Sequence, residues 1–195
     1  MKKLVAVILT FLLVLTGCSK VRVTKIQDDV KTDGIRFSEE YKTLSSDNIY
    51  EYSTYDNIID VLKSDTAVIY LGFKECALCK EIVPILNDVC KEKKVKNILY
   101  YNFKEIRNNN TKEYQNLVSI LNDYIKTDEE GLKKITAPTI IFVNKGETRG
   151  IYIGSLSPDQ EEILSNEQKE NLKNSFDSLI NKMYSIETTT SVIEE

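Results

Sequence analysis

Residues 66–79 read TAVIYLGFKECALC, an almost unbroken apolar run that leads directly into two cysteines. The run is rich in β-branched residues, which is typical of a central strand that is covered on both faces. Beyond the cysteines, Ile82, Val83 and Leu86 recur at helical spacing, which predicts a helix to about residue 93. A buried strand that passes into a helix at a C-x-x-C pair leaves few architectures open.

The flanking segments continue this alternation of strands and helices. Further strands are expected at 48–52, at 96–103 and within 137–157, where Asn144-Lys145-Gly146 predicts a hairpin turn. Apolar residues at helical spacing follow Thr54, a candidate N-cap, and recur over 111–126 and 165–184. The expected order is β-α-β-α-β-α-β-β-α. Since parallel strands need helical crossovers, this order predicts an α/β sandwich.

The N-terminus has the pattern of a bacterial lipoprotein signal. Two lysines precede an uncharged apolar run over residues 4–16, which is too short for a membrane span of roughly 20 residues. The next residues, Leu15-Thr16-Gly17-Cys18, resemble a lipobox, whose cysteine becomes the first mature residue and accepts lipid. We therefore expect a signal peptide at 1–17, lipidation of Cys18, and anchoring at the extracytoplasmic face of a bacterial cell membrane.

Composition divides the rest of the chain into three parts. Residues 18–46 are polar with scattered apolar side chains, so we interpret them as the lipidated N-terminus and a tether, with a short helix near 38–44. Residues 47–185 are long enough for one domain with its own core. Residues 186–195 are expected to form a flexible tail.

Charge and residue types exclude several classes of function. Removal of residues 1–17 takes away two lysines and changes the net charge from −4 to −6, and no basic stripe points to nucleic acid. The chain has no histidine, which removes the usual general base, the Ser-His and Cys-His hydrolytic arrangements, and most zinc and copper sites. We expect no metal and no cofactor.

The C-x-x-C pair has the spacing of a redox dithiol. Cys76 falls at the predicted helix start, where unpaired N–H groups and the helix dipole lower a thiol pKa and favour the nucleophilic thiolate. Cys79 lies about one turn further on, so its thiol can attack a mixed disulfide on Cys76 and release the partner. An extracytoplasmic location permits such disulfide chemistry.

The same cysteine pattern also allows two other interpretations, a metal site and a structural disulfide. A zinc site needs four ligands, and Cys90 would lie about 16 Å from Cys79 along the helix, too far to join it. A structural Cys76–Cys79 disulfide is the other alternative, although such a short link constrains little chain. Cys90 itself lies on the apolar face of the helix and is interpreted as a core residue.

Several motifs together resemble the thioredoxin-like superfamily over roughly residues 47–184. The motifs are the strand running into C-x-x-C, Pro84 five residues after the second cysteine, TAPTIIFVNKGE with Pro138 in the cis-proline position, and the glycine-containing GSLS at 154–157. The resemblance implies a thioredoxin-like sandwich with a central mixed β-sheet flanked by helices. It also implies that Ala137 and Pro138 shape the groove that binds the substrate peptide beside Cys76.

The chain departs from that family at positions that control redox behaviour. Glu75 precedes the first cysteine where the family often has Trp, Tyr70 occupies the place of a buried acid, and Ala77-Leu78 replaces the Gly-Pro of many reductases. The extra helix over 111–126, inserted before the cis-proline strand, is expected near one rim of the site. This insertion and the lipobox also resemble bacteriocin transport accessory proteins.

These observations lead to one expected function and one alternative. The expected function is a membrane-anchored, extracytoplasmic thiol–disulfide oxidoreductase that reduces, forms or exchanges disulfides in exported proteins. Its partners would be cysteine-containing exported proteins and a redox partner protein. The alternative is a non-redox accessory module that uses the same fold to assist secretion or assembly of a partner.

Overall fold

The computed structural model describes residues 32–128, 130–154 and 163–185 of the chain. The predicted signal peptide at 1–17, the predicted lipid acceptor Cys18 and the predicted tail at 186–195 lie outside these residues. Residues 155–157 of the GSLS motif also lie outside them. No helix among the described residues combines the length and the apolar character that crossing a bilayer would require.

A five-stranded mixed β-sheet forms the centre of the fold, with strand order β1-β3-β2-β4-β5. β1 and β2 run parallel to β3, whereas β4 is antiparallel to both β2 and β5. The prediction of an α/β fold with a central mixed sheet is therefore confirmed, including the hairpin between the last two strands. The strands are β1 (Tyr50–Tyr52), β2 (Ala67–Gly72), β3 (Ile98–Asn102), β4 (Thr139–Asn144) and β5 (Glu147–Ile153).

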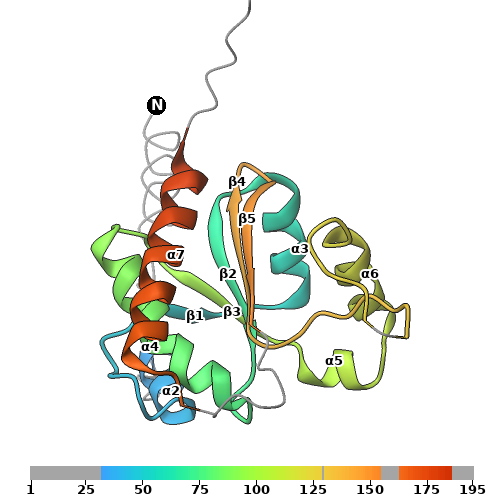
Figure 1. Ribbon diagram of the computed structural model, residues 1–195. Helices are drawn as coiled ribbons and strands as arrows, with labels where there is room; N and C mark the ends of the chain where they lie inside the picture. The colour runs from blue at the N-terminus through green and yellow to red at the C-terminus, as the bar shows by residue number, and fades with distance from the viewer. Residues whose placement is uncertain (1–31, 129, 155–162, 186–195) are drawn as a thin grey trace, which may run out of the picture. The chain divides into compact units, whose positions relative to one another are not determined.

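Helices cover both faces of this sheet (Figure 1). α4 and α7 lie together on one face, with α2 packed into the same core, and α3 and α6 lie on the other. Thr54 caps α3 as predicted, since its side chain accepts a hydrogen bond from the Asn57 N–H at 3.2 Å. The helices are α2 (Asp33–Glu40), α3 (Tyr55–Ser64), α4 (Ala77–Glu92), α5 (Lys104–Asn108), α6 (Lys112–Ile120) and α7 (Asn166–Tyr184).

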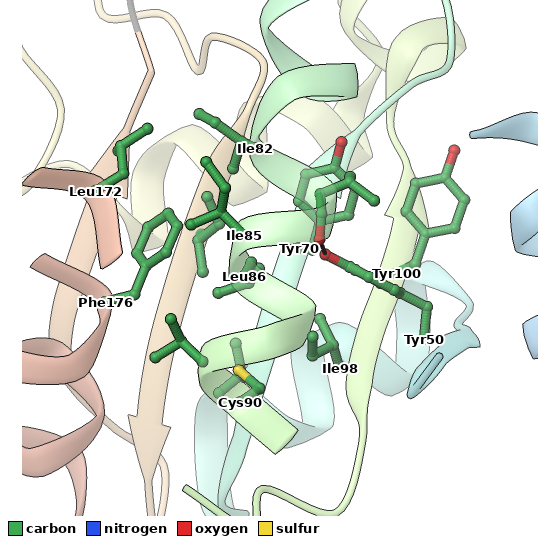
Figure 2. Close-up of a cluster of buried hydrophobic side chains, with 14 of the residues drawn as sticks. Tyr50, Tyr70, Ile82, Ile85, Leu86, Cys90, Ile98, Tyr100, Leu172 and Phe176 are labelled. Carbon is green, nitrogen blue, oxygen red and sulfur yellow. Dashed lines mark hydrogen bonds between the residues drawn. The ribbon is translucent and has the colours of Figure 1, made fainter. Parts of the chain in front are cut away.

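The central strand β2 is buried on both faces, as its apolar run predicts. Val68 and Tyr70 face the core under α4 and α7, while Ile69 and Leu71 face the core under α3. Figure 2 shows the first of these cores, with α4 between Phe176 of α7 and the aromatic side chains of the strands. Since β2 is covered on both sides, the residues after its carboxyl end, including both cysteines, are held by two packed layers.

The start of the folded domain at residue 47 was predicted wrongly, because α2 belongs to the core. Phe37 and Tyr41 are fully buried, and the Phe37 ring stacks on Tyr50 at 4.0 Å between ring centroids. The segment after α2 also replaces a hydrogen bond that α4 lacks. Pro84 has no N–H to donate to the Lys80 carbonyl, and the hydroxyl of Thr43 donates to that carbonyl instead, at 3.1 Å. A short helix near 38–44 was expected within this polar segment, but α2 starts at residue 33 and ends at residue 40.

The inserted segment also differs from its prediction. A single helix over 111–126 was expected, but α6 ends at Ile120, and a short helix, α5, precedes it. Asn122 and Asp123 hydrogen-bond to each other through their side chains, and such residues favour turns over helix interiors. Ile125 remains buried after the helix has ended, so the apolar spacing continued through a turn and was read as helix.

Candidate redox site at the start of α4

Cys76 is the N-cap residue of α4, at the position that its sequence predicts. The Cys76 sulfur accepts a hydrogen bond from the backbone N–H of Cys79 at 3.2 Å, as a capping side chain does. The loop from β2 is closed by a hydrogen bond from the Cys76 N–H to the Phe73 carbonyl at 3.1 Å. The strand end and the helix start together determine where this sulfur lies.

The surroundings of Cys76 favour its thiolate. The pKa of the Cys76 thiol is lowered to about 7, chiefly because the Cys79 side chain hydrogen-bonds to the Cys76 sulfur. Partial burial opposes this shift, whereas the backbone N–H groups of Cys79 and Leu78 and the positive charge of Arg107 add to it. The side chain is half-buried, so the thiolate remains open to an approaching reactant.

Cys79 lies behind Cys76 and is fully buried. Burial raises the pKa of its thiol far above the ordinary range, and the neighbouring charge of Cys76 raises it further. Two contacts oppose this: hydrogen bonds to the Cys79 sulfur from the Tyr70 hydroxyl and from the backbone of Phe73 favour its thiolate and lower its pKa in part. Tyr70 in turn shares a hydrogen bond of 3.1 Å with the hydroxyl of Tyr41. The buried cysteine thus ends a chain of two tyrosine hydroxyls.

Gly72 determines the direction of the Tyr70 side chain. Both residues lie on the same face of β2, and a Cβ placed on Gly72 would lie 2.2 Å from the Tyr70 hydroxyl oxygen. The Tyr70 ring therefore lies across Gly72 and points toward the carboxyl end of the strand, where Cys79 lies. The sequence marks Tyr70 only as the residue in the place of a buried acid. No motif indicated Gly72 or Tyr41, although Phe37 and Tyr41 stand at helical i, i+4 spacing.

The loop before β4 completes the wall next to Cys76. The Ala137–Pro138 peptide bond is cis, as the resemblance implies, and the Cys76 thiol donates to the Ala137 carbonyl at 3.5 Å. Gly154 packs against Pro138 so closely that an added Cβ would lie 2.7 Å from the proline ring. The hydroxyl of Tyr114, on α6, accepts a hydrogen bond from the Ile135 N–H at 3.0 Å. The structure therefore brings Cys76, Cys79, Ala137 and Pro138 together.

A hollow of about 320 Å³ opens beside Cys76. Phe73, Leu78 and Ala137 give it an apolar lining, and Arg107 supplies its only charged lining side chain among the described residues. The Arg107 guanidinium lies 4.8 Å from the centre of the Phe73 ring, which holds it at the rim. No motif in the sequence marked Arg107, because α5 itself was not predicted.

The remaining cysteine lies away from this site. Cys90 is fully buried near the carboxyl end of α4, as predicted (Figure 2). Burial raises the pKa of its thiol to about 12. Across the described residues, no three Cys, Asp or Glu side chains come close enough to hold a metal ion together.

Comparisons with known proteins do not identify a relative: no protein-family model matches the chain, and no curated protein sequence does either.

Proposed function

We propose that the protein is a thioredoxin-like thiol–disulfide oxidoreductase in which Cys76 attacks and Cys79 resolves. The observation that carries this proposal is the pairing of a half-buried, N-capping Cys76 with a buried Cys79 one turn away. The cis Ala137–Pro138 loop beside Cys76 supports the same conclusion. A structural disulfide would not need a lowered pKa on one cysteine and a raised pKa on the other.

The reductive direction has two steps. The Cys76 thiolate attacks one sulfur of a partner disulfide, which forms a mixed disulfide and releases the other partner sulfur as a thiolate. Cys79 then loses its proton and attacks the Cys76 sulfur, so that the partner leaves as a dithiol and the protein holds a Cys76–Cys79 disulfide. Two electrons pass from the protein to the partner, and the reverse sequence oxidises a partner dithiol.

The chain's own groups assist each step. In the first, N–H groups at the start of α4 and the cation of Arg107 stabilise the attacking thiolate. In the second, Cys79 must ionise in a buried site, and the hydrogen bond from the Tyr70 hydroxyl lowers the cost of that ionisation. We expect the substrate backbone to lie beside the Ala137 carbonyl, which is 3.5 Å from the Cys76 sulfur.

The proposed location is the extracytoplasmic face of a bacterial membrane, with lipid on Cys18. This part rests on the LTGC motif and the apolar run before it. Exported proteins with cysteines would be the substrates, and a second redox protein would restore the starting oxidation state. Loss of membrane association and of lipid labelling in a Cys18→Ser variant would test the anchor.

The redox function is tested by trapping its intermediate. In a Cys79→Ala variant the mixed disulfide on Cys76 cannot be resolved, so partner proteins should accumulate as reducible bands on non-reducing gels. The control is Cys90→Ala, which removes a buried cysteine that takes no part and should trap nothing. If Cys79→Ala traps no partner and reduced Cys76 is inert toward model disulfides, the proposal is wrong.

A further inference from the structure

Two hollows meet at the rim of the cysteine pair. The one beside Cys76 measures about 320 Å³, and the second, of about 540 Å³, lies between α5, α6 and the segment before the cis-proline. Arg107 and Thr136 line both, so the hollows adjoin along one rim. The second hollow also includes Leu132, a side chain that is 52% exposed. Together they extend the site from the reactive sulfur onto the inserted segment.

The charges along this rim have one sign. Among the described residues that line the two hollows, every charged side chain is cationic: Arg107, Lys133 and Lys134. The acid nearest in sequence to the reactive sulfur is Glu75, and it is paired with Lys104 at 3.4 Å. The protein as a whole is acidic, with a net charge of −4, so the cationic side chains at this rim are a local feature.

Of the three cations, Arg107 is the one that lines both hollows and has no carboxylate partner among the described residues. Lys134 is neutralised by Asp128 at 2.7 Å and Glu130 at 3.3 Å, and the Lys133 ammonium donates to the Asn122 carbonyl. Arg107 bonds to a neutral oxygen, the side-chain amide of Asn108 at 3.2 Å, and no carboxylate within the described ranges pairs with it. Its guanidinium also lies over Phe73, which restricts its motion and leaves its outward N–H donors for a planar anion.

We propose that Arg107 selects substrates that carry an acidic side chain within two residues of the reacting cysteine. The substrate class is a cysteine-containing peptide segment that lies extended in the two hollows. Its sulfur meets Cys76, its apolar atoms lie on Phe73 and Leu78, and its carboxylate binds Arg107. This inference rests on the proposed oxidoreductase function and adds a specificity-determining residue to it.

The preference is measured in the first of two thiol–disulfide exchanges. The Cys76 thiolate attacks the peptide sulfur of a peptide–2-thiopyridyl disulfide, which forms the Cys76–peptide disulfide and releases 2-thiopyridone. Cys79 then attacks the Cys76 sulfur and frees the peptide thiol, so one disulfide is consumed and one is formed. The release of 2-thiopyridone therefore measures the first step alone, before Cys79 acts.

The experiment uses the full-length reduced protein and matched peptides. Each peptide has one activated cysteine, with Glu, Gln or Lys scanned over the two positions on either side. The rate due to Cys76 is obtained by subtracting the rate of a Cys76→Ala variant. At the preferred position and low salt, we expect the Glu peptide to react about 3- to 10-fold faster than the Gln peptide, and the Lys peptide slowest. Added salt should reduce this ratio.

Variants separate recognition from reactivity. Arg107→Gln should bring the Glu-to-Gln ratio to about 1, and Arg107→Lys should keep part of it, because a charge remains. Arg107→Gln should also raise the pKa of the Cys76 thiol, so the reaction rates fall for all peptides. The Glu-to-Gln rate ratio is therefore the informative quantity. Lys112→Gln removes an exposed cation from the same insertion, outside both hollows, and should leave the ratio unchanged.

The outcomes distinguish the two proposals. Equal rates for Glu and Gln peptides at every position, with Cys76 reactive, would overturn the role of Arg107 and leave the oxidoreductase function standing. An equal loss of preference in Lys112→Gln and Arg107→Gln would overturn it as well. If no peptide reacts faster than with Cys76→Ala, the redox function fails, and this inference fails with it.

Discussion

Cys76 and Cys79 stand one helical turn apart, yet they meet opposite environments. Cys76 lies at the rim near Arg107, its sulfur accepts a hydrogen bond from the Cys79 N–H, and the pKa of its thiol is lowered to about 7. Cys79 lies inside, against Tyr70, and burial raises the pKa of its thiol. The same residue type thus becomes a nucleophile on one side and a resolving thiol on the other, because the helix start faces outward and its first turn faces the core.

The difference shows that the rim and the interior make separate contributions to one reaction. At the rim, charge and open N–H groups determine how readily Cys76 ionises. Inside, the aromatic wall formed by Phe37, Tyr41 and Tyr70 keeps water from Cys79. Substitutions on the two sides should therefore affect different steps.

The largest effect is expected when the interior wall is broken. Phe37→Ala should lower the free energy of unfolding by about 3–5 kcal/mol, because a fully buried ring that stacks on Tyr41 and Tyr50 is removed. Chemical denaturation measures this loss. The matched control is Ile35→Ala on the exposed side of α2, where the cost should stay within about 1 kcal/mol. Equal small losses would mean that α2 is not part of the wall.

The next largest effect separates the two thiols by their reactivity. In the reduced protein at pH 7, alkylation should modify Cys76 about 5- to 10-fold faster than a thiol with the ordinary pKa of 9, because its larger thiolate fraction is partly offset by the lower nucleophilicity of a low-pKa thiolate. Cys79 and Cys90 are buried and should stay unmodified. Mass spectrometry of the digested protein identifies the modified residue. The rate for Cys76 should rise with pH around a midpoint near 7. Modification of Cys79 before Cys76 would reverse the assignment of roles.

A smaller effect is expected when the hydrogen bond to Cys79 is removed. Tyr70→Phe leaves the ring but deletes the hydroxyl that favours the Cys79 thiolate, so the pKa of that thiol rises further. Resolution of a mixed disulfide on Cys76 should slow about 10-fold, which quenched-flow measurement of peptide release would detect.

The control for this prediction is Tyr50→Phe. Tyr50 is equally buried in the same cluster, but its hydroxyl donates to the Val83 carbonyl at 2.9 Å. It should cost stability without slowing resolution. If the two variants slow peptide release to the same extent, the effect comes from packing and Tyr70 has no special role.

The smallest effect is the pH dependence of stability in the reduced protein. The pKa of Cys76 is depressed on folding, so its contribution is present above the unfolded pKa of about 9 and is lost as pH falls through about 7. After allowance for its partial exposure, this amounts to about 1 kcal/mol between these pH values.

Cys79 contributes with the opposite sign, because its pKa is raised on folding. Its stabilising effect is complete below the unfolded pKa and is lost as pH rises above about 9. Unfolding measured from pH 6 to 10 should therefore show stability rising to about 9 and then falling. Cys76→Ser should remove the rising part alone. A rise that survives this substitution would have to come from another group.

Much of the fold could be predicted because its signals are local. The apolar run of β2, the helical spacing after Cys79 and the Asn144-Lys145-Gly146 turn each indicate their own element. The same holds for Cys76 as an N-cap, since strand, loop and helix follow each other directly. The predictions failed for α2 and for the end of α6, where polar composition and continued apolar spacing are poor guides to where a helix begins or ends.

The sequence by itself determined the order of the strands and of α3, α4, α6 and α7, the central buried strand, and a cysteine pair at a helix start, because each depends on neighbouring residues. The tertiary structure alone decided what surrounds each sulfur. Tyr41 reaches Tyr70 from 29 positions away, and Ala137 reaches Cys76 from 61. Arg107 lines the same hollow as Cys76 and comes from α5, a helix that no sequence pattern predicted. A thiol pKa depends on these long-range neighbours and on burial, which exist only once the chain is packed.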